Sequence, residues 1–333
     1  MSKEQTVNFW FRNPLKEYFS IENVFNELAN ELQNEATVSI QKKHVPFTSS
    51  SLKTVIKNSQ FAAKNSSGIN HVTGDIYYIT PYLKGKKIIT IHDFVLFRRT
   101  QNFFKKQLFK YLWYTQPIKS ADIITVISPQ IKKELLDLFT IDENKIKVIP
   151  NFYNPYYTSL QKITSQIENK ILFIGDTENK NLTRVIEALH GINIHLDIVG
   201  KPSINDTQLL AKNNIKYQLH INITDAELGV LYQTSTMLLF PSLYEGFGLP
   251  IIEAQAVGLP VITSNIEPMS WVAGEAAFLV DPTNIKAIRE AVISVQSNVA
   301  LVQQIVSKGF KNIKRFSLPA ISQQYLQCYQ QLQ

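Results

Sequence analysis

The sequence contains almost no cysteine and no long apolar run. Cys328 is the single cysteine among 333 residues, so neither a disulfide within the chain nor a thiolate metal cluster can form. A reducing compartment is the simplest interpretation of this composition. No apolar stretch reaches about 18 residues, so we expect no membrane-spanning helix. No long apolar run follows Met1, so we expect no signal peptide. We therefore expect a cytoplasmic protein.

Acidic residues are scarce in the first half of the chain. Residues 1–150 carry 21 Lys and Arg against 13 Asp and Glu, a net charge of +8, whereas residues 151–333 carry 13 against 14, a net charge of −1. This asymmetry predicts an anionic partner for the first half only, and nucleic acid and an anionic membrane surface are both candidates. With 44% apolar and 18% charged residues, the composition is that of a globular protein, and the length fits two domains.

Strands alternating with helices are predicted along the whole chain. Residues 88–91 and 123–127 are short, β-branched and apolar on both faces, a pattern typical of buried parallel strands. The alternation stops over residues 150–157, where we place a domain boundary, and then resumes. The predicted fold class is therefore α/β, with two units that contain parallel sheets. Ligands are expected at the carboxyl ends of the strands.

The most informative stretch is residues 241–253, Pro-Ser-Leu-Tyr-Glu-Gly-Phe-Gly-Leu-Pro-Ile-Ile-Glu, which follows a predicted buried strand. Gly246 and Gly248 allow the backbone to approach a ligand closely. Pro250 is well suited to the first turn of a helix. We therefore expect the N–H groups of residues 248–251 to form an anion site that suits a phosphate.

Two carboxylates flank this predicted phosphate site. Glu245 precedes it in the loop, and Glu253 lies one turn inside the helix. Two negative charges would repel a lone phosphate, but a carboxylate accepts paired hydrogen bonds from vicinal hydroxyls. One glutamate could hold a ribose and the other a hexose, with a diphosphate between them, which describes a nucleotide-sugar. The structural alternative is a glycine-containing strand–helix turn with two solvated glutamates.

The whole string resembles the signature of the retaining, group 1 nucleotide-sugar glycosyltransferases, in which two glutamates are separated by seven residues. Weaker landmarks of the same family follow in the expected order: Ile91-His92-Asp93, Val126-Ile127-Ser128, Val148-Ile149-Pro150-Asn151, Gly175 to Asn181, Ile198-Val199-Gly200 and Gly274 to Pro282. The resemblance therefore extends over nearly the whole chain.

The resemblance implies the GT-B architecture, which consists of two facing Rossmann-like domains. Residues 1–150 would form the acceptor-binding domain, and residues 151–316 would form the nucleotide-sugar-binding domain. Residues 317–333 would form a C-terminal helix that returns to pack on the first domain.

The resemblance also implies roles for individual residues at the donor site. Glu253 would bind the ribose hydroxyls. The donor sugar and phosphate would be held by Glu245, Gly246 and the amides of Phe247, Gly248 and Leu249. His92 would face the donor sugar, although a histidine hydrogen-bonded near a strand end is the plain alternative.

Charge on the leaving diphosphate must also be compensated. No Asp-x-Asp metal motif occurs in the sequence, so we expect no metal and no cofactor besides the donor. The resemblance implies a basic pair instead, with Lys180 as one member and Lys201 as a plausible second; either could also be an ordinary surface lysine. The family often has arginine immediately before the first lysine, where this chain has Asn179. The expected catalytic residues are His92, Lys180 and Glu245.

Residues 98–114 mix five cations with large apolar side chains. Phe104, Leu108, Tyr111 and Leu112 recur at helical spacing. A basic amphipathic helix of this kind can lie on an anionic membrane surface, and the alternative is a core helix with a solvated basic face. Nucleic acid is the weaker candidate, because no nucleic-acid-binding motif accompanies the charge.

The predicted function is that of a retaining, metal-independent hexosyltransferase. It would move a hexose from a nucleoside diphosphate sugar to an acceptor hydroxyl, in bacterial-type surface polysaccharide or glycolipid assembly. The acceptor would be a glycan or a lipid-linked molecule, and the protein would be cytoplasmic or peripheral on the inner membrane face. A non-catalytic sugar-binding or partner-stabilising GT-B subunit is one alternative, and an epimerase or a phosphorylase on a similar scaffold is another.

Overall fold

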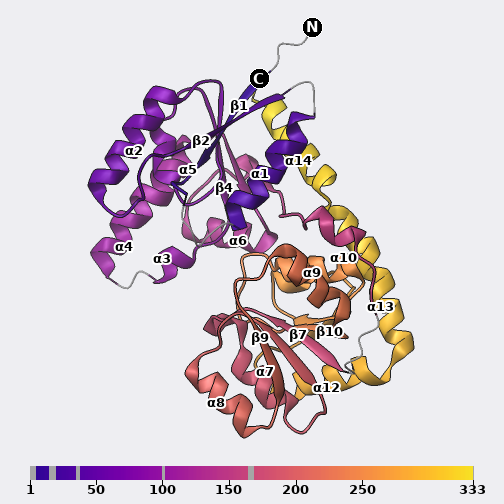
Figure 1. Cartoon of the computed structure of the whole chain (residues 1–333). Coiled ribbons are helices and arrows are strands. Elements are labelled where there is room, and N and C mark those ends of the chain that lie inside the picture. The colour runs from indigo at the N-terminus through magenta and orange to yellow at the C-terminus, as the bar shows by residue number, and fades with distance from the viewer. Residues whose placement is uncertain (1–4, 15–19, 35–37, 100–101, 164–168, 333) are drawn as a thin grey trace. The chain divides into compact units, whose positions relative to one another are not determined.

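The computed structural model describes residues 5–14, 20–34, 38–99, 102–163 and 169–332, and it divides into two compact units (Figure 1). Unit 1 consists of residues 1–151 and 318–333, and unit 2 consists of residues 152–317. The sequence placed the boundaries after residues 150 and 316.

Unit 1 contains a six-stranded parallel sheet. Its strands are β1 (Gln5–Phe11), β2 (Val38–His44), β3 (Ile69–Val72), β4 (Lys86–Ile91), β5 (Ile123–Val126) and β6 (Ile146–Val148). They lie in the order β2-β1-β3-β4-β5-β6. The chain therefore leaves β1 toward one side of the sheet and returns on its other side as β3, which creates a topological switch point between these two strands.

Helices and short helical turns surround this sheet. The α-helices are α1 (Ser20–Gln33), α2 (Leu52–Asn65), α3 (Val95–Arg99), α4 (Phe103–Phe109), α5 (Gln116–Ser120), α6 (Pro129–Leu138) and α14 (Leu318–Gln330). The 3-10 turns are η1 (Tyr77–Tyr82) and η3 (Glu143–Lys145), and η2 (Lys110–Thr115) is a π-helical turn. Ser128 caps α6 by accepting a hydrogen bond from the Ile131 amide, and Pro129 occupies the first turn.

The C-terminal helix α14 belongs to unit 1 and packs against α1. Tyr325 and Tyr329 are buried, and the Tyr329 hydroxyl lies 2.8 Å from Nδ1 of His71 on β3. The other ring nitrogen of His71 lies 2.7 Å from Thr90 Oγ1 on β4. A residue 258 positions away in sequence thus completes a buried polar network of this sheet.

Unit 2 contains a second six-stranded parallel sheet. Its strands are β7 (Lys170–Ile174), β8 (His195–Val199), β9 (Lys216–His220), β10 (Met237–Phe240), β11 (Val261–Ser264) and β12 (Phe278–Val280), in the order β12-β11-β10-β7-β8-β9. Its helical elements are η4 (Pro155–Ser159), η5 (Glu178–Lys180), α7 (Leu182–Leu189), α8 (Ile204–Lys212), α9 (Asp225–Thr234), α10 (Leu249–Val257), α11 (Met269–Ala273), α12 (Ile285–Ser297), α13 (Val299–Asn312) and η6 (Ile313–Phe316). The switch point of this sheet lies between β7 and β10.

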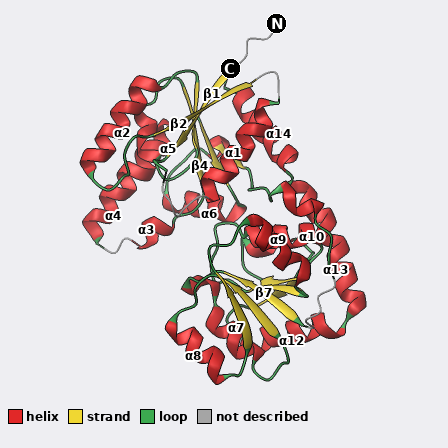
Figure 2. Ribbon diagram, viewed as in Figure 1, coloured by secondary structure: helices red, strands yellow, loops and turns green. Residues whose placement is uncertain are grey.

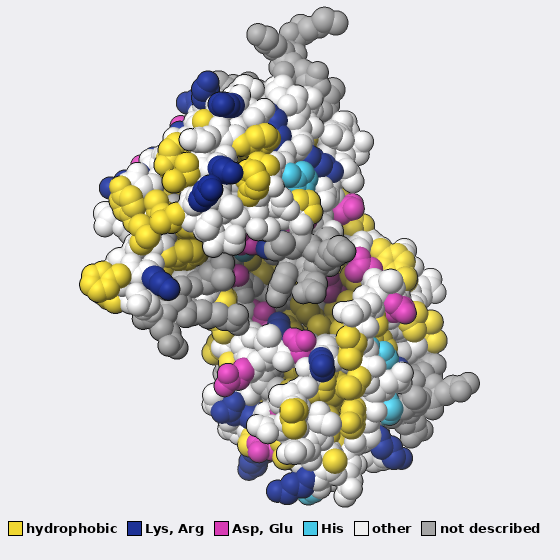
Figure 3. All heavy atoms as spheres, turned by 60° about the vertical axis from the view of Figure 1, so that its left-hand side comes forward, with side chains coloured by type: hydrophobic (Ala, Val, Ile, Leu, Met, Phe, Trp, Pro, Cys, Tyr) yellow, Lys and Arg dark blue, Asp and Glu magenta, His cyan; other side chains and the backbone are white. Residues whose placement is uncertain are grey.

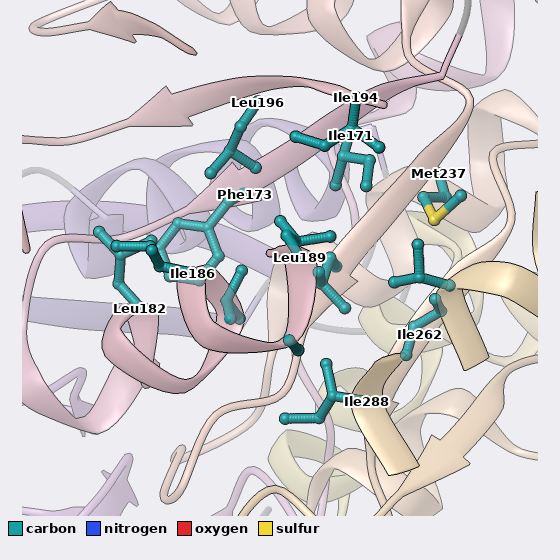
Figure 4. Close-up of a cluster of buried hydrophobic side chains, with 14 of the residues drawn as sticks. Ile171, Phe173, Leu182, Ile186, Leu189, Ile194, Leu196, Met237, Ile262 and Ile288 are labelled. Atoms are coloured by element: carbon teal, nitrogen blue, oxygen red, sulfur yellow. The ribbon is translucent and has the colours of Figure 1, made fainter. Parts of the chain in front are cut away.

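The core of unit 2 lies between the sheet and helices α7 and α12. Figure 4 shows Ile186 and Leu189 of α7 directed toward Phe173 of β7, with Ile262 of β11 and Ile288 of α12 alongside. Helices α9 and α10 lie on the opposite side of the sheet (Figure 2). Apolar residues point from the strands to both faces, which explains the continuous apolar runs of the sequence. The α/β class with parallel sheets is confirmed.

Residues 98–114 do not form one continuous amphipathic α-helix. Helix α3 ends at Arg99, residues 100–101 lie outside the described part, and α4 continues into the π-helical turn η2. The alternative of a core helix is also wrong for the described residues of α4, because every side chain of this helix is at least partly exposed. Phe104 is 83% exposed and Leu108 is 47% exposed. The predicted apolar stripe therefore faces solvent.

Candidate functional site

The signature loop lies at the switch point of the unit 2 sheet. Glu245 follows β10, and Lys180 follows β7, so the two residues come from the neighbouring strands at which the chain direction reverses. Their side chains form an ion pair with 2.6 Å between Lys180 Nζ and Glu245 Oε1, and both are largely shielded from solvent. The two predicted residues, 65 positions apart, are therefore brought together at the edge where open α/β sheets bind ligands.

Gly175 makes room for the Lys180 side chain. A Cβ atom at position 175 would lie 2.4 Å from Lys180 Cγ, and the backbone φ of +124° is one that other residues rarely adopt. The Lys180 ammonium group also lies 4.9 Å from the centroid of the Phe240 ring, a favourable cation–π distance. Gly175 therefore leaves the space that the Lys180 side chain occupies.

Two asparagines attach the β7–α7 connection to the signature loop. Asn179 donates a hydrogen bond from its side chain to the Tyr244 carbonyl at 2.9 Å and accepts one from the Leu243 amide at 2.7 Å. Buried Asn181 donates to the carbonyls of Pro241 and Pro282 at 3.0 and 2.7 Å. Asn179 therefore holds the loop in place at the position where the family often has arginine.

Helix α10 begins directly after the loop, as predicted. Gly248 is its N-cap residue, with φ of +103°. The predicted run of free amides over residues 248–251 is wrong in part. Pro250 has no N–H, and the Ile251 amide donates to the Gly248 carbonyl at 3.0 Å. The anion site at this helix start is therefore narrower than the sequence suggested, and the amides of Gly248 and Leu249 remain its candidate donors.

Aromatic side chains support the loop from behind. Phe247 is buried, and its ring lies edge-on to Phe316 at 5.6 Å and to Trp271 at 6.4 Å between centroids. The Arg315 guanidinium lies 4.7 Å from the centroid of the Trp271 ring. Trp271 thus belongs, with Phe316, to the aromatic cluster that packs against Phe247. Gly246 lies in the loop between Glu245 and Phe247.

Glu253 lies on α10 and is fixed by a tyrosine from α9. The buried Tyr232 hydroxyl donates a hydrogen bond to Glu253 Oε2 at 2.8 Å. Burial raises the pKa of Glu253 to about 7, the hydrogen bond from Tyr232 opposes this rise, and the charge of Asp225 adds to it. Near neutral pH both the protonated and the ionised form of this carboxyl group are therefore populated.

Lys201 and His92 are placed differently from the central pair. Lys201 follows Gly200 at the end of β8, next to β7, and its side chain is exposed. His92 belongs to unit 1, where it is buried after β4, and its Nε2 lies 2.7 Å from the Thr73 carbonyl oxygen, to which it can donate. Burial lowers the pKa of His92 and favours the neutral ring.

Within the described ranges, no group of three or more His, Cys, Asp and Glu side chains is arranged to hold a metal ion. In the same part of the chain, none of the helices combines the length and the apolar character that crossing a membrane requires.

Sequence reasoning missed three supporting residues of this site: Gly175, Asn181 and Tyr232. Gly175 and Asn181 were noted only as the ends of a landmark. Tyr232 left no signal, because an aromatic residue within a helix is indistinguishable from an ordinary core residue until α9 is placed beside α10.

The two parallel sheets and the loop after β10 are those of a GT-B-type protein. Comparison with known families agrees, because the model "Glycosyl transferases group 1" matches residues 160–312 and the model "Glycosyltransferase Family 4" matches residues 50–156. The chain belongs to the group 1 glycosyltransferases.

Individual relatives support the same assignment. The chain is 25% identical to O-antigen chain mannosyltransferase B of Escherichia coli over 284 residues, which cover 78% of this chain and 74% of that protein. It is 27% identical to the O-antigen chain mannosyltransferase RfbU of Salmonella typhimurium, over 74% of this chain and 70% of that one.

Solved structures share the fold across the whole chain. A glycosyltransferase from Rickettsia africae superposes with a TM-score of 0.79 at 22% identity, covering 99% of this chain and 98% of that chain. Anabaena HepE in complex with UDP-glucose superposes with a TM-score of 0.79 at 14% identity, covering 98% of this chain and 100% of that chain.

Proposed function

We propose that this protein is a retaining hexosyltransferase that moves a hexose from a nucleoside diphosphate sugar to an acceptor hydroxyl. The observation that carries the proposal is the Lys180–Glu245 ion pair at the switch point, beside the Gly248-capped start of α10. A cation and backbone amides suit a diphosphate, and carboxylates suit sugar hydroxyls. Mannose is the proposed hexose, because several relatives are named mannosyltransferases.

Charge development at the leaving group is the step this site is suited to assist. As the bond between the anomeric carbon and the phosphate oxygen breaks, negative charge grows on the diphosphate. Lys180 and the amides at the start of α10 would stabilise that charge, with Lys201 as a further cation, so we propose a reaction that needs no metal. The acceptor oxygen would attack on the face that the phosphate leaves, and its proton would pass to the departing phosphate oxygen, which retains the anomeric configuration.

The two glutamates have different proposed roles. Glu253, held by Tyr232, would accept hydrogen bonds from the ribose hydroxyls. Glu245 would orient the hexose rather than act as a nucleophile, and its ion pair with Lys180 would hold its side chain in place. His92 would face the donor sugar from unit 1. The protein would act in surface polysaccharide or glycolipid assembly, in the cytoplasm or at the inner membrane face.

A panel of nucleoside diphosphate sugars tests the donor assignment. A sugar nucleotide that binds the folded protein raises its melting temperature, and the release of nucleoside diphosphate in the presence of acceptor measures transfer. Glu253→Ala is expected to weaken donor binding by about tenfold or more, and Glu245→Gln is expected mainly to lower kcat. The control is Glu290→Gln, because Glu290 is an exposed glutamate on α12.

Each outcome separates the candidate functions. Unchanged kinetics in both glutamate variants would remove the site assignment. Donor binding without transfer or hydrolysis would favour the non-catalytic sugar-binding subunit. Release of nucleoside diphosphate only with acceptor present would exclude an epimerase and a phosphorylase, and analysis of the product linkage would test retention.

A further inference from the structure

Unit 1 contains an open apolar groove that the proposed donor chemistry does not use. Helix α2, turn η1 and the π-helical turn η2 enclose about 540 Å³. Its lining includes Leu52, Ile56, Ala63, Tyr82, Tyr111 and Leu112. Leu52, Ile56 and Tyr82 are each more than half exposed. Large apolar side chains clustered in this way on a surface are typical of a binding site.

A second hollow has a volume of about 220 Å³, and we call it the polar hollow because charged and amide side chains contribute to its lining. Arg12 and Asn13 follow β1 and Asp75 follows β3, so this hollow lies at the switch point of the unit 1 sheet. Phe109 and Trp113 line it as a stacked pair with ring centroids 4.8 Å apart. An aromatic face beside hydrogen-bonding side chains suits a sugar ring, which has C–H groups on its faces and hydroxyls at its edge.

The two hollows share a wall. Tyr78 lines the apolar groove and packs its ring 4.8 Å from that of Trp113, while its hydroxyl lies 2.7 Å from Ser49 Oγ in the polar hollow. In η2 itself, Tyr111 and Leu112 line the groove and Trp113 lines the polar hollow. π-helical turns are rare and occur frequently at functional sites, so the position of η2 between the two hollows suggests a functional role. Because the hollows differ in their lining and share a wall, they suit one ligand that has two chemically different parts.

The segment of the chain that forms the groove is strongly basic. Residues 36–121 contain 14 Lys and Arg and only two acidic residues, Asp75 and Asp93. Asp75 pairs with Arg12, and Asp93 accepts a hydrogen bond from the Val95 amide. Exposed Lys53, Lys57 and Lys84 neighbour groove residues in the sequence.

Figure 3 shows hydrophobic and basic side chains side by side on this face of unit 1. An apolar groove within such a surface complements a hydrocarbon chain that carries an anionic group.

We propose that the acceptor of this enzyme is an anionic lipid-linked sugar, whose hydrocarbon chain lies in the α2–η1–η2 groove and whose sugar lies in the polar hollow beside Trp113. This inference rests on the proposed transferase function and narrows its acceptor to one of the two classes that the sequence left open. Vesicles that contain phosphatidylglycerol would recruit the protein through the same basic face, and added salt would weaken that recruitment.

Direct binding of a dansylated long-chain fatty acid tests the groove. Its fluorescence rises when the probe enters an apolar site. Ile56→Glu places a carboxylate against the chain and is expected to weaken binding by about tenfold or more. Ile293→Glu is the matched control, because Ile293 is an exposed isoleucine of α12 in unit 2. Ala63→Phe fills the groove without adding charge and is expected to have the same effect as Ile56→Glu.

Kinetics with alkyl glycosides of increasing chain length test the acceptor. In the wild type KM is expected to fall as the chain lengthens, and in Ile56→Glu and Ala63→Phe this dependence is lost while short-chain acceptors react as before. Equal KM values for all chain lengths, or fatty-acid binding unchanged in both groove variants, would overturn the proposal. The melting-temperature shift caused by the donor is measured in the same variants. If no donor shifts the wild type, the transferase function itself has failed.

Discussion

The hydrogen bond from Tyr232 lowers the pKa of Glu253, the carboxylate proposed to bind the ribose. Without the hydroxyl, burial alone would push the pKa of Glu253 above the value of about 7 that it has in the unliganded protein. A protonated carboxyl group has lost acceptor capacity for a pair of vicinal hydroxyls. The hydroxyl of Tyr232 therefore acts as a positioning group that favours the ionised form of Glu253 near neutral pH, the form that the proposed ribose binding requires.

This arrangement predicts a pH dependence of donor binding. In the role proposed for Glu253 only the carboxylate form binds the donor, so affinity for a nucleoside diphosphate sugar is expected to fall as pH drops below about 7, by up to about tenfold per pH unit. Tyr232→Phe removes the hydrogen bond that stabilises the charged form, so the midpoint of the profile is expected to move to higher pH. The phosphates of a sugar nucleotide are diesters and do not titrate in this range.

Titration calorimetry at several pH values measures the effect. Glu253→Gln is the control, because it carries no titrating group and its profile is expected to be flat. A Tyr232→Phe profile that coincides with that of the wild type would show that the hydroxyl does not act on the carboxylate.

At the scale of elements, the site depends on loops that follow different strands. Asn181 is buried, has a φ of +69°, and donates to carbonyls at the ends of the β10 and β12 strands. It thereby joins three connections on the carboxyl edge of the unit 2 sheet. Lys180 is its immediate neighbour, so any displacement of this connection moves the cation.

We expect Asn181→Ala to lower the free energy of unfolding by about 2–4 kcal/mol, because two buried carbonyls lose their donor. Chemical denaturation measures this loss, and donor affinity is expected to fall with it. Asn298→Ala is the control, since Asn298 is an exposed N-cap residue of α13, and its loss is expected to cost about 1 kcal/mol. Equal losses in the two variants would contradict the bridging role of Asn181.

At the scale of the whole molecule, the last helix completes the first unit. Helix α14 buries Tyr325, Leu326 and Tyr329 in unit 1, and the His71–Tyr329 hydrogen bond lies inside that core. Burial lowers the pKa of His71 to about 3, so the ring stays neutral and needs its two hydroxyl partners.

Removal of residues 318–333 is therefore expected to abolish the cooperative unfolding transition of unit 1 in calorimetry and to leave that of unit 2 in place. Tyr329→Phe, a milder change, is expected to cost about 1–2 kcal/mol in unit 1 alone. A unit 1 transition that survives the deletion unchanged would show that α14 is dispensable for this core.

Local patterns predicted much of this protein. The apolar run at residues 237–240 coincides with β10, and Ser128-Pro129 begins α6 as expected. Strand and helix boundaries of this kind depend on residues that are adjacent in the sequence, so one sequence is enough to predict them. The prediction of a single amphipathic α-helix over residues 98–114 was wrong. Helix α3 ends at Arg99, and the i→i+5 hydrogen bonding of η2 changes which side chains lie on the same face.

The sequence by itself determined the α/β class, the signature loop and membership in the glycosyltransferase family, because strand composition, glycine and proline positions and glutamate spacing are local properties. Only the tertiary structure decided that Lys180 meets Glu245, that Tyr232 meets Glu253, and that α2 and η2 enclose a groove. These pairs lie 21 to 65 positions apart. They meet because parallel strands place their following loops at one edge, and the order of the strands decides which loops become neighbours.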